Sequence, residues 1–360
     1  MKHSIFVLCF AALCTAAFSE RLTFSEKQSI DYTPHPNVGN PYALITRASG
    51  GGVIFTDAYV DAFMRCATPL TSNGTDDNAA NTWQVCRDTD YAGSFGSGES
   101  FQGVTYDGTA YYACGIKGAA GCQLVRAVDS GNDTTRWTGV MLTLSADGLY
   151  SGVTAVGLNN VVMPNYDTGA LQFFTIAGNN ATANGAPVAN PSATGFKTTQ
   201  AFYYDSGTTK YIFVYMVNDT TTRRIDYFTT NGTPAGTTYV GTFAAGLTSD
   251  MPAAGHYKQK WGNLNIDPVS KIMVAAVNAG NTDGNLNGFD AFDLATISAN
   301  QTAYMQVRGG DIAVPGSKNV AGLAFFTVTP NKYLAVTHGN HLTIYNAVTL
   351  TGVKDWTLYE

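Results

Sequence analysis

The sequence predicts an all-β chain, and three observations support this prediction. Glu, which favours helices, occurs at only four of the 360 positions: Glu20, Glu26, Glu99 and Glu360. Thr, Val, Tyr and Phe, which favour strands, are plentiful. Short apolar segments also recur in pairs, each pair joined by turn-forming residues. Helices therefore contribute little to the expected fold.

The segment Phe101–Ile116 reads as a strand, an Asp-Gly turn and a second strand. Hairpins of the same kind begin at Tyr42, Tyr150, Thr199, Gly262 and Val320. Each is followed by a third apolar strand, and several by a fourth, at a spacing of about 50 to 60 residues. Six such units predict a six-bladed β-propeller of four-stranded antiparallel blades. A seventh blade built from residues 184–197 and 246–261 is an alternative, and a β-sandwich is another.

The repeated hairpins resemble those of secreted β-propellers, most loosely the six-bladed lactonase-like and NHL-like group. The resemblance covers nearly the whole chain after its first residues, but it concerns architecture and identifies no specific family. Lactonase-like hydrolases hold a divalent metal on the propeller axis with carboxylates and amides. Because one architecture hosts many activities, the resemblance alone assigns no function.

The first 19 residues have the pattern of a secretory signal peptide: Lys2, an apolar stretch from Ile5 to Ala17, and small residues before Glu20. We therefore expect a secreted, extracellular protein with an N-terminal arm at residues 20–40 and one propeller domain at 41–360. No later segment is apolar enough for a membrane span. The net charge of -6 argues against nucleic-acid binding.

Four of the six cysteines lie after the signal peptide, and these four and six glycosylation sequons fit an extracellular setting. We expect two disulfides between sequence neighbours, Cys66–Cys86 and Cys114–Cys122. The N-glycosylation acceptors are Asn73, Asn132, Asn180, Asn218, Asn231 and Asn300. All except Asn218 follow the third strand of a unit, so glycans there would cover one face and leave the other, with the channel mouth, free. The alternative is that Asn-rich turns simply occur in loops.

Two interpretations fit the N-terminal arm. It supplies an outer strand that closes the ring with the C-terminal Asp355–Glu360, which removes a free sheet edge. Alternatively it extends to a neighbouring copy and gives head-to-tail assembly.

The first strands of the blades line the channel of a propeller, so aligned positions form a ring. The second position of these strands holds Gln102, Ser151, Gln200 and Asn263. The expected ring is polar and uncharged, and it lacks the carboxylates of a lactonase-like metal site. The alternative to a metal site is that these side chains bind neighbouring backbone groups or water in the channel.

The loops from second to third strand and between blades share one face, where we expect binding. Residues there include His256, Trp261, Tyr166, His338 and His341. In the fifth unit Asp283, Asn285 and Asn287 follow part of the calcium-loop spacing, and Asp290 and Asp293 extend it. No Glu stands at the twelfth position, so a plain turn is the alternative to a Ca²⁺ site.

No catalytic motif is present, and we expect no catalytic residue. The sequence favours a non-catalytic, glycosylated propeller that serves as a binding or building unit of an extracellular coat, matrix or fibre, capable of self-assembly. Its partners would be other extracellular proteins, glycans or copies of itself. One alternative is a metal-dependent hydrolase that uses Asp283 and the three histidines. The other is a lectin that uses Tyr166 and Trp261.

Overall fold

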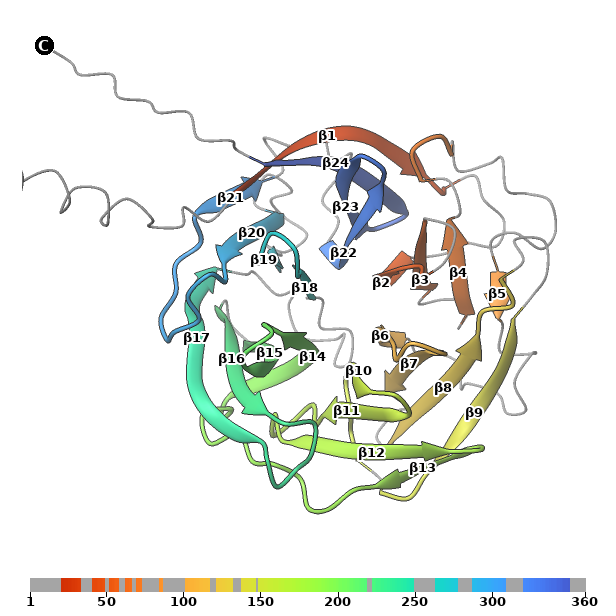
Figure 1. The fold of residues 1–360 in the computed structure, drawn as a ribbon, viewed down its shortest axis with the longest axis vertical. Helices are drawn as coiled ribbons and strands as arrows, with labels where there is room; N and C mark the ends of the chain where they lie inside the picture. Colours follow the sequence, from red (N-terminus) through yellow and green to blue (C-terminus); the bar gives the residue numbers. More distant parts are fainter. Residues whose placement is uncertain are drawn as a thin grey trace, which may run out of the picture.

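The structure is a computed structural model in which every regular element of the described residues is a β-strand. It describes residues 21–33, 41–48, 52–57, 62–66, 69–72, 84–86, 101–116, 121–131, 137–146, 148–218, 222–248, 263–277, 287–308 and 320–349. The strands form small antiparallel sheets arranged around a central axis (Figure 1). The all-β prediction is therefore confirmed, and the arrangement is propeller-like.

Four sheets have four strands each and a fifth has eight. The first contains β2 (Pro41–Thr46), β3 (Val53–Asp57), β4 (Ala62–Cys66) and β5 (Gln84–Cys86). The second contains β14 (Phe196–Asp205), β15 (Lys210–Asn218), β16 (Thr222–Thr230) and β17 (Thr238–Thr248). The third contains β18 (Leu264–Asp267), β19 (Ile272–Val277), β20 (Gly288–Asp293) and β21 (Met305–Arg308). The fourth contains β22 (Val320–Val328), β23 (Asn331–His338), β24 (His341–Thr349) and β1 (Leu22–Asp31).

The eight-stranded sheet combines two consecutive runs of four strands. One run is β6 (Phe101–Tyr106), β7 (Tyr111–Ile116), β8 (Cys122–Val128) and β9 (Thr138–Leu144). The other is β10 (Thr154–Gly157), β11 (Asn160–Pro164), β12 (Leu171–Ala177) and β13 (Asn180–Ala183). Outer strands β9 and β13 join the runs by a parallel pairing of Asn180 with Thr143 and Ala181 with Leu144. The expected six separate sheets are thus five in the structure, because two outer edges meet.

The predicted hairpins are confirmed strand by strand, since all six pair antiparallel. In the hairpin at residues 101–116, Asp107 stabilises the Asp-Gly turn by accepting hydrogen bonds from the backbone amides of Thr109 and Ala110. Its second oxygen accepts from the amide of Asn159 in the neighbouring turn. For the proposed seventh blade, the described residues 184–195 contribute only an isolated bridge between Val188 and Leu171.

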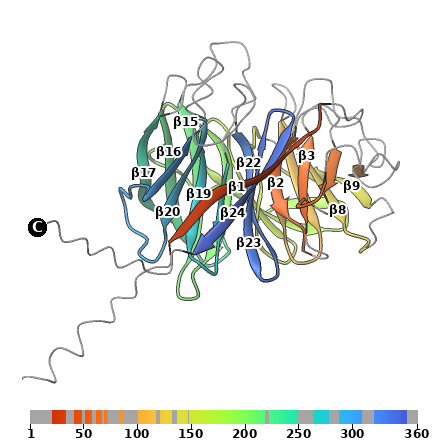
Figure 2. The same ribbon diagram turned by 90° about the horizontal axis from the view of Figure 1, so that it is seen from above.

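The N-terminal strand β1 closes the last sheet from within the chain. It pairs antiparallel with β24, with Leu22 opposite Thr349 and Asp31 opposite His341. Figure 2 shows β1 lying along the outside of the ring against β24. Closure within the chain, one of the two interpretations, is what the structure has. The partner strand, however, is β24, and the expected partner Asp355–Glu360 lies outside the described residues.

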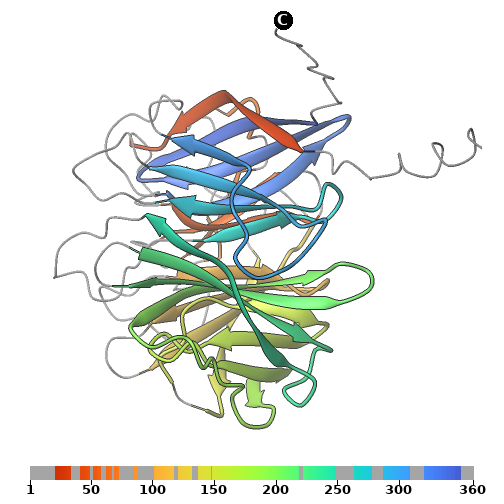
Figure 3. The same ribbon diagram turned by 90° about the vertical axis from the view of Figure 1, so that its left-hand side faces the viewer.

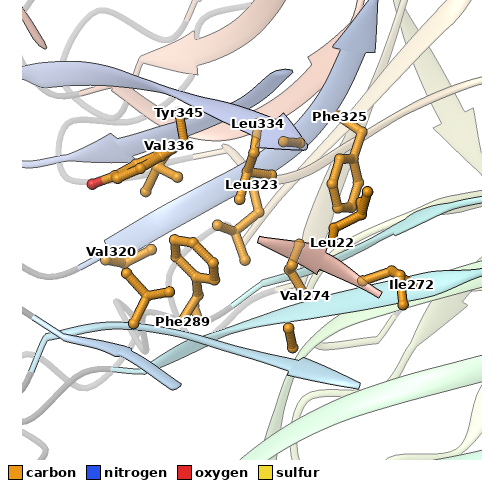
Figure 4. Packing of buried hydrophobic residues seen from close by; sticks show 14 residues of the cluster. Leu22, Ile272, Val274, Phe289, Val320, Leu323, Phe325, Leu334, Val336 and Tyr345 are labelled. Atoms are coloured by element: carbon orange, nitrogen blue, oxygen red, sulfur yellow. The ribbon is translucent and has the colours of Figure 1, made fainter. Parts of the chain in front are cut away.

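The hydrophobic core lies between neighbouring sheets, which stand side by side around the axis (Figure 3). Figure 4 shows one such cluster, in which Phe289 of the third sheet faces Leu323 and Leu334 of the fourth. Leu22 of β1 belongs to the same cluster and is buried. The N-terminal strand therefore adds an apolar side chain to the core as well as backbone hydrogen bonds.

Side chains of the innermost strands bind the backbone of the neighbouring innermost strand. Thr105 Oγ1 accepts a hydrogen bond from the amide of Ala155, and Thr154 Oγ1 accepts one from the amide of Tyr203, both at 2.9 Å. Asn265 Oδ1 accepts from the amide of Phe325 at 3.3 Å. These bonds fix neighbouring innermost strands relative to each other, so side chains near the axis are held in place.

Candidate functional site: the axial cavity

All six innermost strands contribute to one cavity of about 570 Å³ on the axis. Its apolar lining comes from Val104, Val153, Phe325 and Phe326, and its polar lining includes Thr105, Thr154, Gln200, Asn263 and Asn265. The volume lies within the range of about 300–1,000 Å³ that small-molecule sites use. The sequence predicts a central channel lined by the first strands, and the structure has a cavity there, lined by residues of these strands.

The cavity lies toward the C-terminal ends of the innermost strands. Its exposed residues, Ala48, Pro268 and Thr327, follow or end those strands, whereas Gln200 and Asn263 are buried at 3% exposure each. The same end of the sheets carries the turns between first and second strands and those between third and fourth strands. The sequence predicts the channel mouth on the opposite face, so this prediction differs from the structure. The cavity lies at the end of the sheets where most sequons occur.

The predicted ring residues divide into three groups. Gln200 and Asn263 line the cavity. Ser151 is fully buried and donates a hydrogen bond to the carbonyl oxygen of Thr198, so it links the segment before β10 to β14. The side chain of Gln102 lies outside the part of the chain that the structure describes.

Gln200 occupies a tight position between inner strands. A Cβ atom added to Gly103 or to Gly152 would lie 2.6 Å from Gln200 Oε1, so both positions require glycine for this packing. Gly152 also has a φ of +75°, which favours glycine. Among the described residues, Gln200 Oε1 has no hydrogen-bond partner although it is buried. This oxygen has almost no accessible surface and lies beside Gly103 and Gly152, so it is enclosed by the inner strands and not open to the cavity.

Two charged residues line the cavity, and both are ion-paired. Arg47 forms a two-pronged pair with Asp129, at 2.8 Å from Nε and 3.0 Å from Nη2. Asp267 pairs with Lys332 and accepts hydrogen bonds from Ser270. Burial raises the pKa of Asp267, but the bonds from Lys332 and Ser270 outweigh burial and leave the pKa below its ordinary value. Both charges are therefore balanced by a neighbour of opposite sign.

The predicted histidine face is only partly described. His256 and Trp261 lie outside the described residues. His338 and His341 are buried, and their rings stack with centroids 5.4 Å apart. His338 Nε2 lies 2.6 Å from Thr343 Oγ1, and His341 Nε2 lies 3.6 Å from Asp31 Oδ1 of β1. The structure thus brings these two histidines together beside the closing strand.

Tyr166, expected on an open sugar-binding face, is buried at 6% exposure. The ammonium of Lys197 lies over its ring, 5.4 Å from the centroid. This cation–π contact and the burial leave little of the ring to stack on a sugar.

The expected calcium loop is also only partly described, since Asp283 and Asn285 fall outside the described residues. Asn287 is buried at 1% exposure. Asp290, considered as a further ligand, instead accepts from Arg223 at 2.7 Å and Arg308 at 2.6 Å. The sequence did not predict this network of one carboxylate and two guanidinium groups, because its members come from β16, β20 and β21.

The cysteine predictions remain predictions. Cys114 and Cys122 lie on adjacent strands with their sulfur atoms 3.1 Å apart, and the structure holds no bond between them. Burial raises the pKa of the Cys122 thiol, and the hydrogen bond to Cys114 adds to the effect. Cys66 is buried, and the side chain of Cys86 is outside the described residues. The short sulfur separation makes the second predicted pair geometrically accessible to oxidation.

Three of the sequon asparagines are exposed: Asn231 and Asn300 lie between third and fourth strands, and Asn180 is the first residue of the fourth strand β13. Asn218 is half-buried at the end of β15 and accepts a hydrogen bond from the amide of Thr222. Asn73 and Asn132 lie outside the described residues. In the described part of the chain, no helix could span a membrane.

Comparison with known proteins identifies no specific family. No protein-family model matches the sequence, and no curated protein matches it. Solved structures give low-identity matches. "YCF48 bound to D1 peptide" has a TM-score of 0.45 at 11% identity, covering 92% of this chain and 99% of that one. Raptor from Chaetomium thermophilum has a TM-score of 0.48 at 8% identity, covering 92% and 30%. A 6-phosphogluconolactonase-like protein from Bacteroides uniformis has a TM-score of 0.42 at 14% identity, covering 72% and 69%.

Proposed function

We propose that this protein is a secreted, N-glycosylated, non-catalytic propeller of six blades that acts as a binding or building unit of an extracellular coat, matrix or fibre. Two features support six blades. Strands β2, β6, β10, β14, β18 and β22 are innermost and each begins one four-strand unit, and the pairing that merges two units involves only two residue pairs.

The observation that carries the extracellular proposal is the placement of three sequons. Asn231 and Asn300 are exposed in the connection between third and fourth strands, and the exposed Asn180 immediately follows that connection as the first residue of β13. An oligosaccharide transferase needs an accessible asparagine, and a bulky glycan is compatible only with a surface loop. Sugars at these positions would gather at one end of the sheets. The opposite end would then be the one left for protein partners or for copies of the chain.

Secretion with mass analysis tests the first half of this proposal. Protein secreted from a eukaryotic host is expected to lose one glycan mass in the Asn180→Gln variant. The adjacent exposed Asn179 is followed by Asn180 and Ala181 and is no acceptor, so Asn179→Gln provides the matched control. Retention in the cell, or identical masses for the two variants, would count against the proposal.

Assembly is tested separately, by light scattering and negative-stain microscopy of the secreted protein with and without a chelator. Regular oligomers or fibres support a building unit. A monomer at all concentrations refutes the building role. A monomer that tightly retains a divalent ion would instead favour the metal-dependent hydrolase.

A further inference from the structure

We propose that the axial cavity binds a neutral saccharide of one or two rings through side-chain amides, threonine hydroxyls and aromatic walls. This inference goes beyond the extracellular building role and does not depend on it. The site also differs from the sugar-binding face expected around Tyr166, because it lies at the opposite end of the innermost strands.

The first argument is the set of hydrogen-bonding groups. Gln200 lines the cavity with its amide side chain, although its Oε1 is fully buried beside Gly103 and Gly152. Thr105 and Thr154 use their oxygens to accept backbone amides, which leaves each hydroxyl hydrogen to be donated. Asn265 likewise accepts through Oδ1 and retains its amide hydrogens as donors. Each threonine oxygen also keeps a second lone pair as an acceptor, so donors and acceptors occur together, which suits alcohol groups, because each alcohol both donates and accepts.

The second argument is charge. Arg47 and Asp267, the charged residues lining the cavity, are held by Asp129 and Lys332 respectively. An anionic ligand would have to compete with Asp129 for the guanidinium, and a cationic ligand with Lys332 for the carboxylate. A neutral ligand leaves both ion pairs intact, so the cavity favours a neutral ligand.

The third argument is the wall of the cavity. Tyr106, Phe202 and Tyr203 line it and are each half-buried, so part of each ring remains accessible. Aromatic rings supply apolar area against which the C–H face of a sugar packs, while its hydroxyls reach the polar groups. The polar floor is pre-organised by the bonds between inner strands, which reduces the entropy lost on binding.

The test is saturation-transfer NMR and calorimetry with methyl α-glucoside, methyl β-galactoside, methyl α-mannoside, N-acetylglucosamine and glucuronate. At least one neutral sugar is expected to bind, and glucuronate more weakly than methyl α-glucoside. Gln200→Leu removes the side-chain amide that lines the cavity and should weaken binding about tenfold. Gln123→Leu is the matched control: Gln123 is also buried with an unpartnered Oε1 among the described residues, but it lies outside the cavity.

A second pair of variants tests the site without altering its floor. Ala48 is exposed and lines the cavity, so Ala48→Trp should block entry and abolish binding. Val269 is 82% exposed and does not line it, so Val269→Trp should bind normally. The proposal is overturned if no neutral sugar binds the parent protein, or if binding survives unchanged in both Gln200→Leu and Ala48→Trp.

Discussion

The buried ion pair of Asp290 with Arg223 and Arg308 predicts a large loss of stability when the carboxylate is removed. The Arg223 side chain is 0% exposed, so water cannot solvate its charge after Asp290→Ala. An uncompensated buried charge costs about 3–5 kcal/mol. Arg308 is 20% exposed and regains hydration, so Arg308→Ala, which leaves the Arg223 pair intact, is expected to cost less.

Urea unfolding followed by intrinsic fluorescence measures this prediction. A loss of this size lowers the unfolding midpoint by about 1 M or more. Lys197→Ala is the surface control, because the Lys197 and Asp167 side chains are 32% and 46% exposed, and it should cost less than about 1 kcal/mol. If Asp290→Ala costs no more than this control, the argument from burial is wrong.

Three further predictions concern acid stability, oxidation and ring closure. Burial raises the pKa of Asp107, but four hydrogen bonds outweigh it, so the pKa lies below 3.8. Its stabilising effect is present at neutral pH and lost as the pH falls through the folded-state pKa, so Asp107→Asn should show less acid dependence of Tm. Oxidation should join Cys114 to Cys122, seen by non-reducing mass analysis and by a gain of about 2–3 kcal/mol that Cys122→Ser abolishes. Leu22→Ala should cost about 2–5 kcal/mol in denaturant unfolding, whereas the exposed Val348→Ala should be nearly neutral.

The sequence predicted those parts of the fold that depend on local patterns. Strand alternation and the Asp107-Gly108 turn identify the hairpin β6–β7 without any distant information. The pairing of β1 with β24 was harder to predict. It joins residues 325 positions apart, such as Thr23 and Val348, and β24 offered a free edge to several candidate strands. Sequence alone therefore left two interpretations of the N-terminal arm.

The candidate site was predicted less well than the fold. Gln200 and Asn263 were expected at the axis because they share a position in the repeat, and both line the cavity. Asp290 was considered as a metal ligand because its own loop is rich in Asp and Asn. Its actual partner Arg223 lies 67 positions away on another sheet, and a spacing rule within one loop carries no information about it.

The pairing of the first strand with the last has a consequence for how the chain is made. During synthesis, Leu22–Asp31 leaves the ribosome long before its partner His341–Thr349 exists. The other sheets consist of strands close in sequence and can form as they emerge, but the ring can close only after nearly the whole polypeptide is available. Closure is therefore expected as the last folding event, and a truncated product lacking β24 would expose two unpaired edges prone to aggregation.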